Sequence, residues 1–194
     1  MNRKTVRTVV IAAMTLALVP AAFANSHTET KMMSEPMVGG ERMYSARDII
    51  DNAINSKEHT TLVAAVKAAG LVETLKGKGP FTVFAPTNDA FENLPAGTVE
   101  TLLKPENKAQ LARVLTYHVV AGRWDAASIM KQIKAGGGKA MLKTVSGASL
   151  WARMNGPMNV VLQDEKDQIA NISTYDVQQS NGVIHVIDRV VLPN

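Results

Sequence analysis

The 194-residue chain contains no cysteine, and aromatic residues make up only 5% of it. The absence of cysteine excludes disulfides, thiolate metal sites, thiol nucleophiles and a lipid-modified N-terminal cysteine. The sequence also lacks the G-x-S-x-G, Walker, G-x-G-x-x-G and H-E-x-x-H motifs that carry common nucleophile, phosphate and zinc chemistry. We therefore expect a protein that is not an enzyme, with no catalytic residues, no metal site and no cofactor.

The charge of the chain gives little indication of a nucleic-acid partner. Arg3, Lys4 and Arg7 lie in an N-terminal segment of the type that is removed on export, and without them the formal net charge falls from +4 to +1. No basic stripe in the sequence is interleaved with aromatic residues, so we expect no nucleic-acid binding. A hydrophobic content of 46% and a charged content of 20% are typical of a globular protein. The length suits a single domain.

Residues 1–24 have the pattern of a secretory signal peptide. An apolar run from Val9 to Val19 follows the basic start, and Ala22-Phe23-Ala24 has the A-x-A form of a cleavage site. The run is shorter than the roughly 20 residues that span a bilayer. We expect cleavage after Ala24, export to the periplasm or the extracellular medium, and no stable membrane insertion.

Residues 25–41 are polar and aperiodic, with Pro36 and the pair Gly39-Gly40, which is typical of a flexible leader. Thioethers and imidazoles suit copper, so His27 and the nearby methionines form a possible soft-metal set. These methionines are Met32, Met33, Met37 and Met43. Their irregular spacing favours ordinary linker residues instead, and we expect the folded domain to occupy 42–194.

Helical periodicity dominates the first half of the chain. Apolar residues at i, i+3 and i+4 predict a helix at 46–55 that is capped by Ser45. Apolar residues at i, i+4 and i+7 predict a second at 61–69 that ends at Gly70. Further helical segments are expected at 71–75, at 98–103, at 106–118, from Asp125 through Ile133, and in a short helix that carries Phe91 and Leu94.

Strand periodicity dominates the second half. One buried strand is expected at 81–85, among the helices, and the later strands at 139–145, 148–154, 158–162, 168–177 and 183–191 form a β-meander. Helices first and strands later predict an α+β domain with a mostly antiparallel sheet.

Three segments, in order, resemble the boxes of the fasciclin (FAS1) domain family. TVFAPTNDAF at 82–91 is similar to the first box, LTYHVV at 115–120 to the Tyr-His motif, and NGVIHVIDRVVLP at 181–193 to the closing box. The resemblance implies the FAS1 fold, a wedge of β-strands flanked by several short helices. It also implies adhesion, matrix binding or symbiotic contact without catalysis, through a protein or glycan at a cell surface or matrix.

The resemblance also implies partner-binding residues. In animal members an Asp-Ile pair upstream of the closing box takes part in integrin binding, and Asp176-Val177 occupies that place here, although Gln178 departs from the apolar pattern. Tyr117 and His118 of the Tyr-His motif are further candidates. A competing function is that of a carrier, since some fasciclin-like proteins bind carotenoids, and a groove between helices and sheet could hold a small apolar ligand or lipid.

Two histidines could be ligands or bases, yet structural positions suit them better. His118 shares an apolar helix face with Leu111 and Val114, so we expect a packed ring that is hydrogen-bonded to Thr87 or Asn88. His185 alternates with apolar residues in a strand, and with Asp188 alone it offers too few ligands for a metal. We therefore place five residues in the structural motif: Thr87, Asn88, His118, Gly182 and His185.

Overall fold

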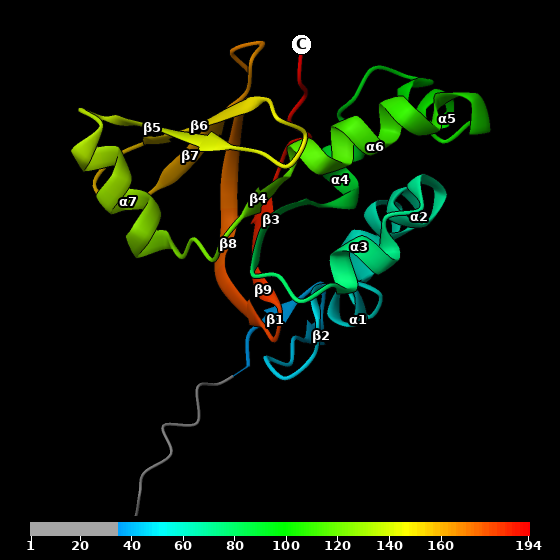
Figure 1. The fold of residues 1–194 in the computed structure, drawn as a ribbon, viewed down its shortest axis with the longest axis horizontal. Coiled ribbons are helices and arrows are strands. Elements are labelled where there is room, and N and C mark those ends of the chain that lie inside the picture. The colour runs from blue at the N-terminus through cyan, green and yellow to red at the C-terminus, as the bar shows by residue number, and fades with distance from the viewer. Residues whose placement is uncertain (1–34) are drawn as a thin grey trace, which may run out of the picture. The chain divides into compact units, whose positions relative to one another are not determined.

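The computed structural model describes residues 35–194, which form a seven-stranded sheet with short helices on two sides (Figure 1). The chain therefore has the predicted α+β class. The expected signal peptide and the first part of the expected leader lie outside the described residues, as do His27, Met32 and Met33. Within the described range, no helix is long and apolar enough to cross a membrane.

The sheet has the strand order β4-β3-β9-β8-β7-β6-β5. Its strands are β3 (Phe81–Pro86), β4 (Val119–Ala121), β5 (Lys139–Lys143), β6 (Ser149–Met154), β7 (Val160–Gln163), β8 (Ile169–Gln179) and β9 (Gly182–Ile187). Consecutive strands from β5 to β9 pair antiparallel, which is the expected meander. Two features were not predicted: the strand β4, and the parallel pairing of β9 with β3.

Helices α1 to α6 lie on one side of β3 and β9, and α7 lies on the other side, beside β5 and β6 (Figure 1). The helices are α1 (Ile49–Ala53), α2 (Thr60–Ala69), α3 (Val72–Lys76), α4 (Asn88–Glu92), α5 (Thr98–Leu102), α6 (Lys108–Tyr117) and α7 (Ala126–Ala135), with 3-10 turns η1 (Lys57–His59) and η2 (Pro105–Asn107). The apolar residues accordingly form two clusters, one under α1 to α6 and one between α7 and the inner face of the meander.

Local sequence signals explain most of the helix ends. Asp125 caps α7 by accepting a hydrogen bond from Ser128 N at 2.7 Å, and Gly70 ends α2 in the left-handed conformation with a φ of 74°. The expected cap of α1 was wrong. Asp48 caps that helix, whereas Ser45 bonds to Glu35.

The expected leader extends too far, because its last residues are folded. β1 (Met37–Val38) and β2 (Glu41–Arg42) pair as a hairpin, and Gly39 and Gly40 supply the positive φ values of 62° and 76° that a two-residue hairpin loop requires. Val38 and Met43 are buried in the core, with exposures of 6% and 2%. Burial of Met43 removes it from the copper-ligand set, and the domain begins ahead of residue 42.

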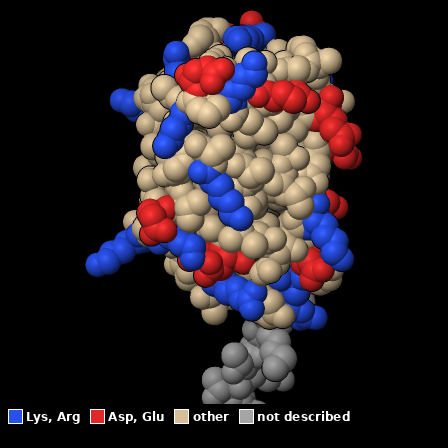
Figure 2. All heavy atoms as spheres, turned by 90° about the vertical axis from the view of Figure 1, so that its right-hand side faces the viewer, with Lys and Arg blue, Asp and Glu red and all other residues tan. Residues whose placement is uncertain are grey.

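The helical side presents charges of both signs. Figure 2 shows this face, on which Lys, Arg, Asp and Glu surround an uncharged middle that one cationic side chain crosses. Opposite charges mixed in this way create no extended field of one sign. This face therefore has no strong electrostatic preference for a charged partner.

Candidate partner-binding groove

The Tyr-His motif does not form a surface. Tyr117 has no exposed area, and its hydroxyl donates to the carbonyl of Ser149 at 2.8 Å. His118 is 2% exposed. Both residues were candidates for partner contact, and burial at the end of α6 shows that assignment to be wrong.

His118 connects α6 to the C-terminal segment. The backbone N–H of Val191 donates to its Nε2 at 3.2 Å, so Nδ1 carries the proton and donates to the carbonyl of Val114 at 2.8 Å. Neither expected partner, Thr87 or Asn88, bonds to the ring. Burial lowers the pKa of His118 to about 4, which keeps the ring neutral near pH 7.

Thr87, Asn88 and Gly182 hold the domain together in other ways. Thr87 caps α4 through the N–H of Ala90, and the Asn88 amide accepts from Thr61 N at 3.0 Å, which connects α4 to α2. A Cβ atom on Gly182 would lie 2.2 Å from the carbonyl oxygen of Phe81. Because that oxygen belongs to the neighbouring strand β3, only glycine allows β9 to begin at this position.

The Asp176-Val177 pair lies in an irregular part of β8, where the register with β9 shifts twice. Val177 is 1% exposed and belongs to the core, so its assignment to a contact surface was wrong. Asp176 has a φ of 57°, and its carboxylate accepts from Ala126 N, at the start of α7, at 2.8 Å. The bulge turns this carboxylate toward α7, so Asp176 is a positioning residue and not a free receptor contact.

His185 lies next to Asp176 and is fully buried. Its Nδ1 accepts from Asp176 N at 3.3 Å, and its Nε2 donates to the carbonyl of Trp124 at 2.8 Å. The ring stacks on Phe84 with a centroid distance of 5.6 Å, and burial lowers its pKa. His185 is thus a neutral connector in the interior.

Metal binding gains no support from the region around His185. Asp188 is occupied by Asn171, whose backbone and side-chain nitrogens donate to it at 2.8 and 2.7 Å. Within residues 35–194 no three His, Asp or Glu side chains come together as a metal site. The described range therefore offers no ligand set of the usual size.

Asp176 and His185 together fix the segment that leads into α7, because one holds Ala126 N and the other holds the Trp124 carbonyl. The Trp124 backbone N–H also donates to the Thr82 hydroxyl at 2.8 Å. Arg123 turns away and donates to the Gly182 carbonyl at 2.6 Å. The loop between β4 and α7 is therefore tied to β3, β8 and β9.

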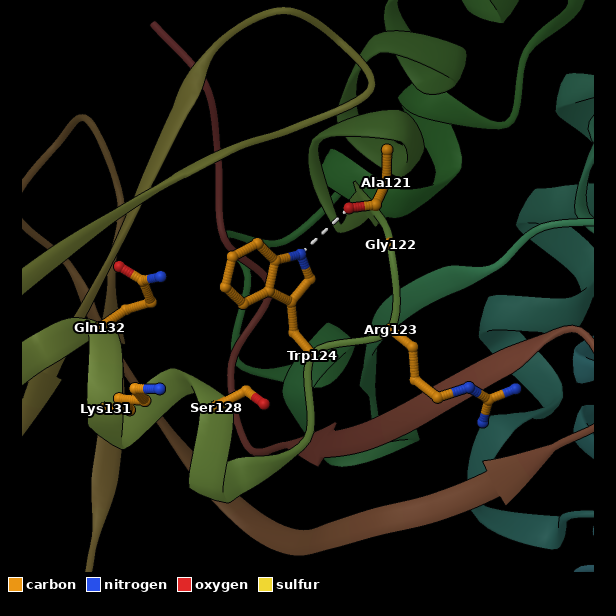
Figure 3. Close-up of a pocket in the computed structure, with 7 residues that line it drawn as sticks. All are labelled: Ala121, Gly122, Arg123, Trp124, Ser128, Lys131 and Gln132. Atoms are coloured by element: carbon orange, nitrogen blue, oxygen red, sulfur yellow. Dashed lines mark hydrogen bonds between the residues drawn. The ribbon is translucent and has the colours of Figure 1, made fainter.

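A groove of about 380 Å³ opens beside this loop (Figure 3). The Trp124 ring lies at its centre, its Nε1 donates to the Ala121 carbonyl at 3.0 Å, and the Gln132 amide points toward it. The groove is lined by Ala121, Gly122, Arg123, Trp124, Ser128, Lys131 and Gln132. It offers one aromatic surface, several hydrogen-bonding groups and two cationic residues, Arg123 and Lys131, which is chemistry suited to recognition.

The groove residues were not identified from the sequence. Trp124 is one of only two tryptophans in the chain and directly precedes the helix cap Asp125. A tryptophan beside a helix start is a usable signal of a binding surface, because the helix cap orders the neighbouring backbone and the large indole is rarely buried completely. The sequence offered nothing, however, to show that β8 and β9 would hold this loop.

Known proteins resemble the chain over most of its length. The fasciclin domain matches residues 57–193. Protein sll1483 of Synechocystis is 49% identical over 151 residues, covering 77% of this chain and 75% of that protein. Immunogenic protein MPB70 of Mycobacterium bovis is 35% identical over 146 residues, covering 73% of this chain and 66% of that protein.

Animal proteins and one solved structure extend the comparison. Transforming growth factor-beta-induced protein ig-h3 of Sus scrofa is 35% identical over 145 residues, 75% of this chain and 19% of that protein. The FAS1 domain pair of the insect cell adhesion molecule fasciclin I has a TM-score of 0.68 at 17% identity, covering 75% of this chain and 51% of that one. Its fold is thus shared, and the sequence match shows that the chain belongs to the fasciclin (FAS1) domain family.

Proposed function

We propose that this chain is an exported, non-catalytic module of the adhesion type that binds a protein or glycan partner through the groove beside Trp124. The observation that carries the proposal is the rigid placement of Trp124, whose flanking backbone is held by Asp176, His185 and Thr82. Tryptophan is enriched among residues that dominate binding energy, and a pre-organised side chain loses little entropy on binding.

Kinship supports the adhesion class, and the sequence supports export. The structurally similar insect protein is described as a cell adhesion molecule. The A-x-A site at 22–24 follows a short apolar run. Export is checked by the intact mass of protein from the periplasm or the medium, which should begin at Asn25; a form that retains Met1 would contradict it.

The binding test compares two aromatic positions, the half-buried Trp124 of the groove and the exposed Tyr44. Trp124→Ala should weaken attachment of the mature domain, coated on beads, to cells of the producing strain by at least about 30-fold in affinity, the size of a 2 kcal/mol anchor. Tyr44→Ala is the matched control, because Tyr44 is 42% exposed and lies outside the groove. Thermal unfolding of both variants checks that the fold is kept.

Two results would contradict the proposal. If beads that carry the wild-type domain attach to no cell, the proposal that the chain is an adhesion-type module is contradicted. Attachment that survives Trp124→Ala unchanged would move the contact away from the groove.

The carrier alternative finds little space in the apolar hollows. One, lined by residues such as His59 and Val38, has a volume of about 20 Å³, and another, lined by residues such as Phe81 and Leu115, has about 30 Å³. Sites for small ligands measure roughly 300 to 1,000 Å³. Neither hollow therefore accommodates a carotenoid or lipid, so a carrier would have to use the groove of about 380 Å³ beside Trp124, where polar and charged side chains line the wall with the indole. That lining favours a protein or glycan partner.

A further inference from the structure

The outer face of the meander, opposite α7, carries a second unusual surface. On β5 and β6 alternate residues point away from the core, and cross-strand register places Lys139 opposite Arg153, Met141 opposite Trp151, and Lys143 opposite Ser149. The inward residues between them, Ala140, Leu142, Leu150 and Ala152, are at most 5% exposed. The outward set of Lys139, Met141, Lys143, Trp151 and Arg153 is called the basic face below.

Trp151 lies at the centre of the basic face. The ammonium of Lys139 lies 4.0 Å from the centre of the Trp151 ring, which is the geometry of a cation–π contact. Met141, opposite Trp151, is 58% exposed. Lys139 and Lys143 are separated by roughly 13 Å along β5, taking 3.3 Å per residue. Cations therefore flank an apolar, aromatic centre.

The cations of the basic face have no carboxylate partner. None of the ion pairs formed within residues 35–194 includes Lys139, Lys143 or Arg153. The carboxylates of the adjoining β7–β8 turn are occupied: Glu165 accepts from the N–H groups of Ser149 and Asn194, and Asp167 accepts from Gln163. The face thus carries three positive charges, none of which forms an ion pair within residues 35–194, and Arg153 donates only to the neutral Gln163 side chain.

We infer that the basic face binds an acidic polysaccharide of the uronate type. A uronate carries its carboxylate on the sugar ring, so a carboxylate paired with Lys139, whose ammonium covers the Trp151 ring, places the sugar beside the indole and the exposed Met141. The other cations then meet neighbouring carboxylates of an extended chain. Charge complementarity over a flat, partly apolar strand face is the basis of the assignment.

Single-stranded nucleic acid fits the basic face less well. Proteins that bind it stack successive bases on several aromatic side chains, and this face has a single ring. The linear sequence gave no hint of the face, because its cations and its tryptophan come from two strands and meet only through their register. The inference is independent of the Trp124 groove, which opens beside α7 and shares no residue with this face.

The experiment measures binding of polygalacturonate to the full mature domain, using Trp151 fluorescence in a Trp124→Phe background. We expect saturable binding that weakens with salt. The triple variant Lys139→Gln, Lys143→Gln, Arg153→Gln should abolish polygalacturonate binding. Trp151→Ala removes the fluorescent probe, so its binding is measured by calorimetry, and its affinity should be about tenfold lower. The matched charge control is Lys67→Gln, Lys78→Gln, Lys104→Gln, three exposed lysines outside this face; it should bind like wild type.

Ligand controls separate the possible partners. Fully methyl-esterified polygalacturonate has the same backbone without charge and should not bind. Loss of binding in the charge control as large as in the triple variant would overturn the inference, as would a Trp151→Ala variant with unchanged affinity. Tighter binding of single-stranded DNA or poly-glutamate would overturn the polysaccharide assignment. Unchanged melting temperatures of the variants exclude misfolding as the cause of lost binding. Cell attachment is measured in a separate assay on protein that retains Trp124, so that failure of the groove proposal can be told apart from failure of this one.

Discussion

Acid should destabilise this domain through His118. The ring is neutral in the folded state, where burial lowers its pKa to about 4, against an ordinary value of 6.5. Below pH 6.5 the unfolded chain takes up a proton that the folded chain refuses, so stability falls as the pH is lowered from 6.5 to 4. A protonated ring could also no longer accept the hydrogen bond from Val191 N.

The size of the effect follows from the two pKa values. Each pKa unit corresponds to about 1.36 kcal/mol, so His118 should contribute a loss of about 2.5 kcal/mol between pH 7.5 and pH 4.5. Burial also lowers the pKa of His59 and His185, which therefore add losses of the same sign. Asp125 and Glu165 have lowered pKa values as well, but the stability that they contribute is lost mainly as the pH falls below their ordinary values of 3.8 and 4.5, at or below the end of this range.

Urea unfolding of the mature domain at pH steps from 7.5 to 4.5, followed by tryptophan fluorescence, measures the slope. His118→Gln keeps one donor and one acceptor but does not titrate, so its free energy of unfolding should be lower at pH 7.5 and should fall less on acidification. The difference between the two slopes isolates His118. Parallel pH profiles for wild type and variant would refute the argument, because they would show that the ring does not titrate between the two states.

Two substitutions test the strand irregularities. Asp176→Ala should lower the free energy of unfolding by about 1 to 3 kcal/mol, because it removes the acceptor for Ala126 N and places alanine at a φ of 57°. Asp176→Asn should cost less, because asparagine tolerates this φ. An unchanged melting temperature for the alanine variant would show that Asp176 is a free surface residue. Gly182→Ala should cost more than about 3 kcal/mol or prevent folding, since its methyl would meet the Phe81 carbonyl oxygen. Gly156→Ala, where a Cβ meets open space, should cost only about 1 kcal/mol. Equal losses at the two glycines would contradict the steric argument.

Local signals in the sequence predicted most of the elements. The apolar spacing of 61–69 with Gly70, the Asp125 cap and the alternation of the five late strands all correspond to elements of the structure. Each signal acts within a few residues of chain. Where the prediction failed locally, as at Gly39-Gly40, the same composition suits a flexible linker and a hairpin loop, and only the burial of Val38 decides between them.

The candidate site was harder to predict, because it depends on contacts between distant segments. Asp176 was assigned to partner binding because it occupies the place of the Asp-Ile pair of animal members, yet a shift in the β8 register directs its carboxylate to Ala126, 50 residues earlier in the chain. The partners of His118 were wrong for a related reason, since Val191 lies 73 residues away and donates a backbone group. Every residue except proline has a backbone N–H, so the amino-acid sequence does not indicate which residue will donate one to a distant side chain.

The parallel pairing of β9 with β3 has a consequence for how the chain matures. Strand β9 lies inside the sheet, between β3 and β8, but is made of residues 182–187, so it is synthesised after every other strand of the sheet. Until it arrives, β3 lacks its parallel neighbour and β8 lacks one of its two partners, and the contacts to be closed span about half the chain. Long-range pairing of this kind slows folding. The sheet therefore cannot close before residues 182–187 have been synthesised, because until then no strand joins β3 to the meander.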